Sequence, residues 1–186
     1  ILKIHFMKVS SSSFLILMMF VTSCSFIKDS PDDIFNTVGL NTNKIPSSFE
    51  RVFREIRQHK ANGTLQLPTE DGKTMKKATC IEVVKFAYAN TFKEDIKRIK
   101  NLNPNKDAEP IIKAGIELFE YADEIQNKDF MMIAKMIDEG KSDEEIDTAA
   151  KELDETKGLE LDVRYTKVMD LLLPYADANG LEYNKL

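Results

Sequence analysis

The stretch DAEPIIKAGIELFEYADEIQNKDFMMIAKMIDE, residues 107–139, decides the fold of this chain. Its apolar residues recur every three or four positions, which is the spacing of one face of an α-helix. They form two adjoining stripes, so we expect a helix that buries a wide face. Residues 126–129 are polar and interrupt the apolar pattern, so a kink is possible there. The helix is expected to end at Gly140. The first stripe is Ile111, Gly115, Leu118, Ala122 and Ile125, and the second is Ile112, Ile116, Phe119, Phe130, Ile133 and Ile137.

The same spacing predicts helices on both sides of this stretch. They are expected at residues 47–62, 73–102 and 142–179. The first and the third begin at a serine, Ser47 or Ser142, that is followed three residues later by a glutamate. This is the pattern of a capping box, in which the serine and the glutamate each accept a backbone amide at the start of a helix.

These helices predict an all-α fold, an up-and-down antiparallel bundle of about four helices with a short N-terminal tether. The bundle domain is expected at residues 46–186, because short connections make neighbouring helices antiparallel. Residues 24–45 are expected to form the tether and a short segment with one helical turn. Residues 64–67 alternate as in a short strand, but no partner strand is recognised. The sequence leaves open whether the last helix is continuous through Gly158.

The composition argues against a nucleic-acid partner. The whole chain carries a formal charge of −5. Without the first 23 residues, which contain Lys3 and Lys8, 24 basic residues face 31 acidic ones, and the charge is −7. Proteins that bind nucleic acid through its phosphates need a basic face, which this balance does not favour.

The start of the chain carries an apolar run, FLILMMFV, at residues 14–21. Met7 and Lys8 precede the run, and a pair of small residues leads from it into Cys24. A helix that crosses a bilayer needs about 20 apolar residues, so this run is too short. It has the length of the apolar core of a signal peptide, about 7–15 residues.

The motif Val21-Thr22-Ser23-Cys24 resembles the lipobox of a bacterial lipoprotein signal peptide. The resemblance implies that residues 7–23 are a signal peptide and that Cys24 is the lipidation site and the mature N-terminus, carrying fatty acyl chains such as palmitate. It also implies that the protein is anchored in the cell envelope, in the outer membrane by preference, and faces the periplasm or the cell surface. Residues 1–6 are expected to be upstream sequence or a fragment edge. The alternatives are an uncleaved membrane anchor and a chance apolar start.

The mature part offers few residues for catalysis or metal binding. His59 is its one histidine, which excludes a ferritin-like di-metal site and a multi-histidine zinc site. Cys80 is expected to be a small buried core residue rather than a reactive thiol. There is no nucleophile motif and no glycine-rich phosphate loop. We therefore expect no metal and no cofactor.

Adjacent acidic residues are the remaining candidates for acid–base chemistry or calcium binding. Neighbouring side chains diverge on a helix, so a solvated helix face is the preferred interpretation. The groups are Asp123-Glu124, Asp138-Glu139, Asp143-Glu144-Glu145 and Asp154-Glu155.

Phe86 and Tyr121 are the candidate binding residues. Both lie off the main apolar stripe of their predicted helices, which makes them candidates for lining a groove or a partner surface, although a wide core face is the preferred interpretation. The expected function is a lipid-anchored, non-catalytic binding module that contacts an envelope protein or a periplasmic or surface ligand. The alternatives are an envelope enzyme whose carboxylates meet only in the fold and a purely structural envelope tether.

Overall fold

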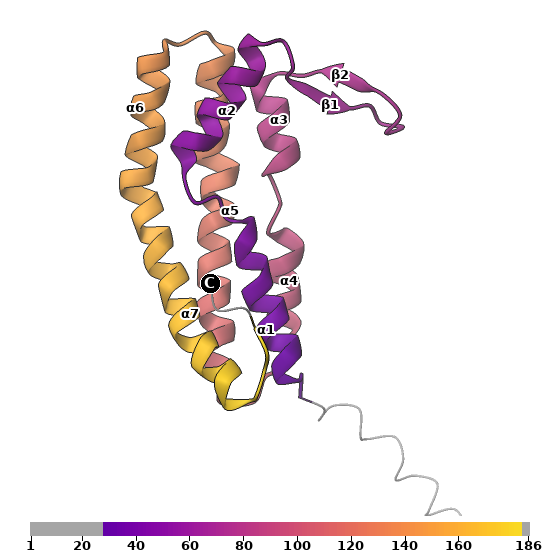
Figure 1. Cartoon of the computed structure of the whole chain (residues 1–186), viewed down its shortest axis with the longest axis vertical. Coiled ribbons are helices and arrows are strands. Elements are labelled where there is room, and N and C mark those ends of the chain that lie inside the picture. Colours follow the sequence, from indigo (N-terminus) through magenta and orange to yellow (C-terminus); the bar gives the residue numbers. More distant parts are fainter. Residues whose placement is uncertain (1–27, 184–186) are drawn as a thin grey trace, which may run out of the picture.

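The computed structural model describes residues 28–183, and α5 (Glu109–Asp138) is the helix along which most others pack (Figure 1). It has 30 residues, so it is about 45 Å long at 1.5 Å per residue. Residues of both predicted stripes are buried along it, and it remains α-helical through residues 126–129. Gly140, with φ of 74°, follows its end. The helix predicted at residues 107–139 is confirmed.

The other elements confirm an all-α fold with one small antiparallel sheet. Figure 1 shows α3 and α4 on one side of α5 and α6 and α7 on the other, with α1 and α2 in front. The helices are α1 (Pro31–Gly39), the 3-10 helix η1 (Leu40–Lys44), α2 (Phe49–Ala61), α3 (Cys80–Ala87), α4 (Lys93–Asn101), α6 (Asp143–Leu153), the π-helical segment η2 (Asp154–Gly158) and α7 (Leu159–Ala178), and the strands are β1 (Gln66–Pro68) and β2 (Met75–Lys77).

The prediction of a helix at residues 73–102 is wrong for the first part of this range. β2 pairs there with β1, and Leu67 lies opposite Lys76, so the strand that lacked a partner in the sequence has one. Gly72, with φ of 68°, and hydrogen bonds within residues 69–74 close the turn between them. The hairpin projects from one end of the bundle (Figure 1).

The rest of that predicted helix is divided into α3 and α4. A capping box of Thr79 and Glu82 begins α3, and the chain leaves the helix between residues 88 and 92. Asn90 has φ of 64°, a left-handed conformation that asparagine tolerates better than most residues. The described residues therefore do not divide into four uninterrupted helices.

The helix predicted at residues 142–179 contains one irregular turn. Ser142 begins α6 in the predicted capping box with Glu145, which is confirmed. The chain then passes through η2 and continues directly into α7, so the backbone stays helical past Gly158. A π-helical turn holds one more residue than an α-helical turn.

The segment before α2 is more helical than expected. Ser30 caps α1 in a box with Asp33, and η1 follows without a loop. Ile34 and Val38 are fully buried. A Cβ built on Gly115 of α5 would lie 2.9 Å from a methyl carbon of Val38, so the missing side chain lets α1 approach α5 closely.

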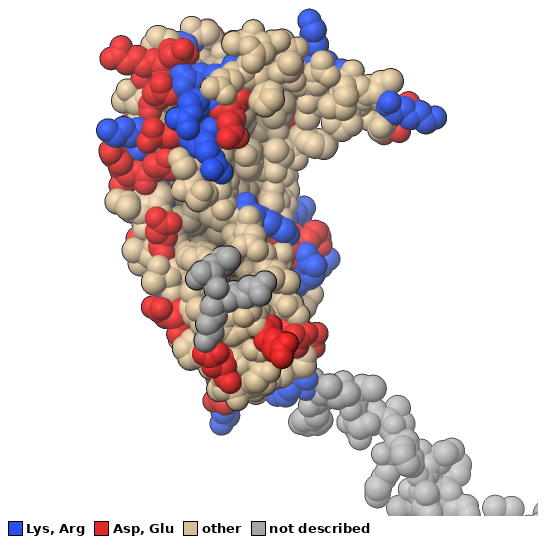
Figure 2. Space-filling view, viewed as in Figure 1, with Lys and Arg blue, Asp and Glu red and all other residues tan. Residues whose placement is uncertain are grey.

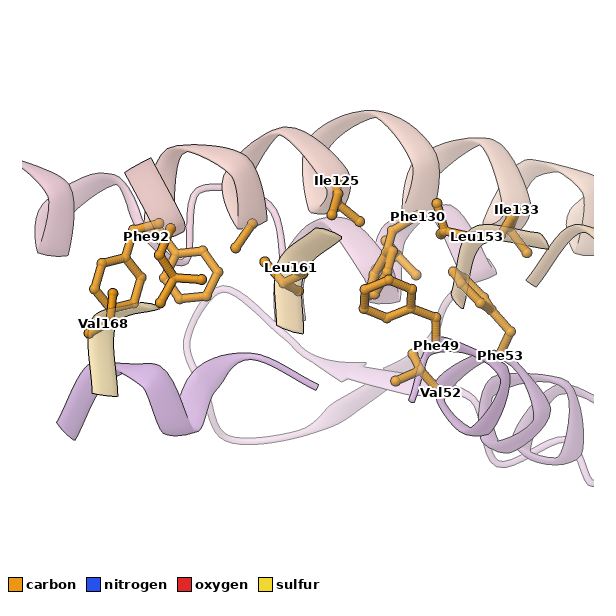
Figure 3. Close-up of a cluster of buried hydrophobic side chains, with 14 of the residues drawn as sticks. Phe49, Val52, Phe53, Phe92, Ile125, Phe130, Ile133, Leu153, Leu161 and Val168 are labelled. Atoms are coloured by element: carbon orange, nitrogen blue, oxygen red, sulfur yellow. The ribbon is translucent and has the colours of Figure 1, made fainter. Parts of the chain in front are cut away.

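An aromatic cluster fills the core where α2 meets α5 (Figure 3). Phe130 is fully buried, and its ring centroid lies 5.1 Å from those of Phe49, Phe53 and Tyr88. All three pairs are edge-to-face, the geometry that the charge distribution of aromatic rings favours. Phe130 thus joins α2, α5 and the α3–α4 connection.

Candidate functional site

A largely apolar groove of about 760 Å³ lies between α1 with η1 and α7. We call it the α1–α7 groove. Its floor includes Gly39, where a Cβ would lie 2.9 Å from Leu172 of α7, so the two helices approach closely there. The apolar walls are Phe35 and Leu40 on one side and Tyr165, Met169, Leu172, Leu173 and Pro174 on the other.

Two side chains of η1 form hydrogen bonds with the backbone of the turn before it. Thr42 is buried, and its hydroxyl donates to the Gly39 carbonyl at 2.7 Å. The Asn41 amide donates to the Thr37 carbonyl at 2.8 Å. These two bonds stabilise the turn between α1 and η1.

A more polar hollow of about 540 Å³ adjoins the groove. The two share Thr42, Asn43 and Tyr165, and Lys44, Arg51 and Asp162 are among the residues that line the polar end. A ligand that follows the groove would thus pass from apolar walls to charged side chains.

Lys44 is held in place by a buried carboxylate. Its ammonium nitrogen lies 2.5 Å from Asp95 of α4, and Arg98 pairs with the same carboxylate. Asp95 is 1% exposed, so removing either cation would leave a buried charge with less compensation. This network fixes the end of η1 against α4.

Glu182 and Tyr183, which follow α7, also line the groove. Gly180, with φ of 67°, follows α7, and the Leu181 amide donates to the Ala176 carbonyl at 3.0 Å. This reversal directs the chain back along the helix. The Tyr183 ring then lies 5.4 Å from that of Phe35, and its hydroxyl donates to Asp177 at 2.9 Å.

Charged side chains are distributed unevenly over this face of the molecule. Figure 2 shows acidic and basic residues gathered over α6 and α2. Arg57 of α2 bridges these helices by pairing with Asp143 and Asp147 of α6. These ion pairs therefore link α2 to α6.

Phe86 and Tyr121 lie in different environments, and neither lines the α1–α7 groove. Phe86 on α3 is 66% exposed. Tyr121 on α5 packs against the core, and the Arg164 guanidinium of α7 lies 4.6 Å from its ring centroid. Burial raises the pKa of the Tyr121 phenol. The sequence analysis missed the groove, although Phe35 and Leu40 beside Gly39 were a signal for it.

Two aspartates of these acidic groups cap the N-termini of helices that lie far from them in the sequence. The Asp138 carboxylate accepts the amides of Cys80 and Ile81 at 2.9 and 3.0 Å, at the start of α3. Asp154 accepts the amides of Phe49 and Glu50 at 2.8 and 3.0 Å, at the start of α2.

The capping box predicted at Ser47 is therefore wrong. The N-cap is Ser48, whose hydroxyl accepts the Arg51 amide, and the carboxylate at this helix start is that of Asp154, which accepts the amides of Phe49 and Glu50. The other acidic groups are also engaged: Glu124 pairs with Lys128. None of these contacts brings two carboxylates together as an acid–base pair would require.

The pKa shifts support this structural interpretation of the acidic residues. Within residues 28–183, every carboxyl group whose pKa clearly departs from its ordinary value has a lowered pKa. A general acid at neutral pH would need a raised one. Burial, with a contribution from Asp138, raises the pKa of the Cys80 thiol to about 12, so this sulfur is protonated and unreactive. His59 lies at the surface and bonds Thr64 at 2.9 Å.

Three further findings concern metal binding, membrane-spanning helices and the lipobox. Among the described residues, no group of three or more histidine, cysteine, aspartate or glutamate side chains could hold a metal ion. In the same part of the chain, no helix is both long enough and apolar enough to span a membrane. Cys24 and the lipobox lie outside the described residues.

Comparison with known proteins leaves the function to be argued from this chain alone. No protein-family model matches the chain, and no curated protein or solved structure is significantly similar to it. The groove and the residues around it are therefore the basis for a functional assignment.

The carboxylate of Asp138 predicts a pH-dependent stability. Burial raises its pKa, but hydrogen bonds from the amides of Ile81 and Cys80 lower it more, so the pKa lies below its ordinary value of 3.8. A lowered pKa in the folded state gives stability that is present above the ordinary pKa and is lost as pH falls through the folded pKa. We expect Asp138→Asn to lower the free energy of unfolding by about 1–2 kcal/mol at pH 7.

Urea unfolding of both proteins at pH 7 and at a series of lower pH values checks this, because the difference should shrink as pH falls through the folded pKa of Asp138. Glu139→Gln is the control: Glu139 is exposed and pairs with Lys135, so its effect should stay within about 0.5 kcal/mol. An Asp138→Asn difference that is the same at all of these pH values would contradict the assignment.

Proposed function

We propose that this protein is a lipid-anchored component of the bacterial cell envelope that works as a non-catalytic binding module, with the α1–α7 groove as its binding site. The lipobox at Cys24 supports the anchoring. The groove supports the binding role, because its volume lies within the roughly 300–1,000 Å³ that small-molecule sites occupy.

The proposed ligand is a small amphipathic molecule. Its apolar part would lie against Leu40, Met169 and Leu173, and its polar part would face Lys44 and Arg51. The observation that carries this proposal is that the apolar groove and the polar hollow adjoin each other and share Tyr165 as a lining residue. Binding sites commonly combine apolar walls with a few placed polar groups.

Anchoring by fatty acyl chains on Cys24 is the proposed means of membrane attachment, with the outer membrane as the preferred location and the periplasm or cell surface as the compartment. Two or more chains would hold the protein stably, whereas one would not. The proposal includes an up-and-down antiparallel order of the helices along α5. An envelope protein bound around the exposed Phe86 is the partner expected under the same function.

The anchoring is tested by mass spectrometry of the N-terminal peptide of the native protein. We expect the peptide to begin at Cys24 and to carry acyl chains. A peptide that retains residues 7–23, or a Cys24 thiol without lipid, would contradict the proposed location.

The ligand is tested by purifying the native, acylated chain and identifying the small molecules that remain bound to it. We expect an amphipathic molecule with the wild type and about tenfold less of it with Leu173→Lys, because the new ammonium would lose its hydration in an apolar groove. Val163→Lys is the matched control, since Val163 is 64% exposed on the same helix and does not line the groove.

Equal recovery from all three proteins would place the molecule elsewhere. Recovery of no amphipathic molecule from any of them would overturn the proposed ligand class. Both outcomes leave the mass-spectrometric result on Cys24 unaffected, so the two parts of the proposal can fail separately.

A further inference from the structure

The polar hollow beside the α1–α7 groove carries more positive than negative charge. Two cationic side chains, Lys44 and Arg51, line it, and among the described residues Asp162 is the one carboxylate that does so. Tyr88 also lines the hollow, and burial raises the pKa of its phenol, so this side chain is neutral at pH 7. Two positive charges and one negative charge leave the lining with a formal charge of +1.

We propose that the α1–α7 groove and the polar hollow together bind an amphipathic anion, whose single negative charge lies between Lys44 and Arg51. This inference rests on the proposed function, because it names the charge of the ligand of the same site. The apolar part of the ligand would lie in the groove, and a carboxylate or another singly charged oxyanion would lie in the hollow.

Lys44 keeps a positive charge for such a ligand although it is already paired. One oxygen of the buried Asp95 carboxylate lies 2.5 Å from the Lys44 ammonium, and the other oxygen pairs with Arg98. Two cations thus share one anion, and the group of three has a formal charge of +1. An ammonium has three hydrogens to donate, and the Lys44 side chain is 40% exposed. Asp95 therefore positions Lys44 without cancelling the charge around it.

Arg51 is the more available of the two cations. Its Nε lies 3.7 Å from Glu55, which is beyond hydrogen-bonding distance, and both side chains are 61% exposed. Exposed ion pairs of this kind contribute little to stability, so the guanidinium can turn from Glu55 to a ligand. A guanidinium binds a carboxylate through two parallel N–H bonds. We therefore expect Arg51 to make the principal contact with the head of the ligand.

Asp162 limits the negative charge that the hollow accepts. It comes from α7, whereas Lys44 belongs to η1 and Arg51 to α2. A carboxylate in the lining repels an anionic ligand, and this repulsion grows with the charge of the ligand. The hollow is therefore suited to a head with one negative charge.

The experiment compares two amphipathic probes of opposite charge, dodecanoate and dodecyltrimethylammonium. Equilibrium dialysis measures their binding to the native, acylated chain in vesicles of phosphatidylcholine, which has no net charge, and protein-free vesicles give the background. At pH 7 and low salt, we expect dodecanoate to bind about tenfold more tightly, because the lining attracts an anion and repels a cation. The advantage should decline as salt is added, since salt screens exposed charges.

Two substitutions that each remove a charge should have opposite effects on dodecanoate. Arg51→Gln should weaken its binding roughly fivefold, and Arg51→Lys, which keeps the charge, should retain most of it. Asp162→Asn should strengthen its binding about twofold, because a repulsive charge is lost. Arg54→Gln is the matched control, since Arg54 is exposed on the same helix as Arg51 and does not line the hollow. A general loss of stability would not produce this pattern.

Equal binding of the two probes, tighter binding of dodecyltrimethylammonium, or binding of neither would overturn this inference. The proposed function would survive each of these results if Leu173→Lys still lost the copurifying molecule. If instead dodecanoate is preferred and depends on Arg51, but no amphipathic molecule copurifies with the native chain, the charge preference stands and the proposed ligand fails.

Discussion

Replacing Phe130 with alanine is expected to lower the free energy of unfolding by about 3–5 kcal/mol. The Phe130 side chain is fully buried and touches three other aromatic rings, so the change removes apolar contacts and leaves a cavity between α2 and α5. Urea unfolding followed by far-ultraviolet circular dichroism measures the loss. A loss of this size is a large part of the stability of a typical domain.

Met132→Ala is the matched control for this prediction. Met132 lies two residues away on α5 and is 55% exposed, so its truncation should change the free energy of unfolding by no more than about 0.5 kcal/mol. Similar effects of the two substitutions would show that the aromatic cluster does not form the core between α2 and α5.

Replacing Gly115 with valine is expected to cost about 1–3 kcal/mol of folding stability and to displace α1. Even a single Cβ would lie 2.9 Å from Val38, whose branched side chain is stiff and fully buried. Since α1 forms one wall of the α1–α7 groove, the same change should reduce the amount of copurifying ligand. Urea unfolding and ligand recovery are the two measurements.

A double-mutant cycle with Val38→Ala identifies the cause. We expect Gly115→Ala to be destabilising alone and less so when Val38 is also alanine, because the crowding methyl groups are gone. Strictly additive effects of Gly115→Ala and Val38→Ala would mean that the close approach of α1 and α5 is not the source of the cost.

The parts of the fold that depend on local patterning were predictable. The two apolar stripes of residues 107–139 match the buried face of α5, because a helix that is covered on several sides needs a wide apolar face. Ser142 and Glu145 were recognised as a capping box because both partners lie within one helical turn.

The parts that depend on distant residues were not predictable from the pattern. Residues 73–102 keep helical spacing because α3 and α4 both present apolar residues such as Val84 and Ile99 to α5, and this spacing does not reveal a break at Asn90. The β-hairpin was missed because its strands are three residues long and each needs the other.

The candidate site was missed for the same reason. The groove depends on how Gly39 meets Leu172, more than a hundred residues later in the chain, and on the return of Tyr183 to Phe35. Phe86, for which the sequence favoured a core face, is exposed, and the sequence pattern gives no means of placing the two ends of the domain beside each other.

Asp138 and Asp154 have a consequence for the order in which this chain folds during synthesis. Isolated helices shorter than about 12–15 residues are only marginally stable in water, and α2 and α3 have 13 and 8 residues. Each also takes part of its N-terminal capping from an aspartate that the ribosome adds more than fifty residues later. The first half of the domain therefore leaves the ribosome before the groups that complete it exist, and it reaches its final form only after residue 154 has emerged.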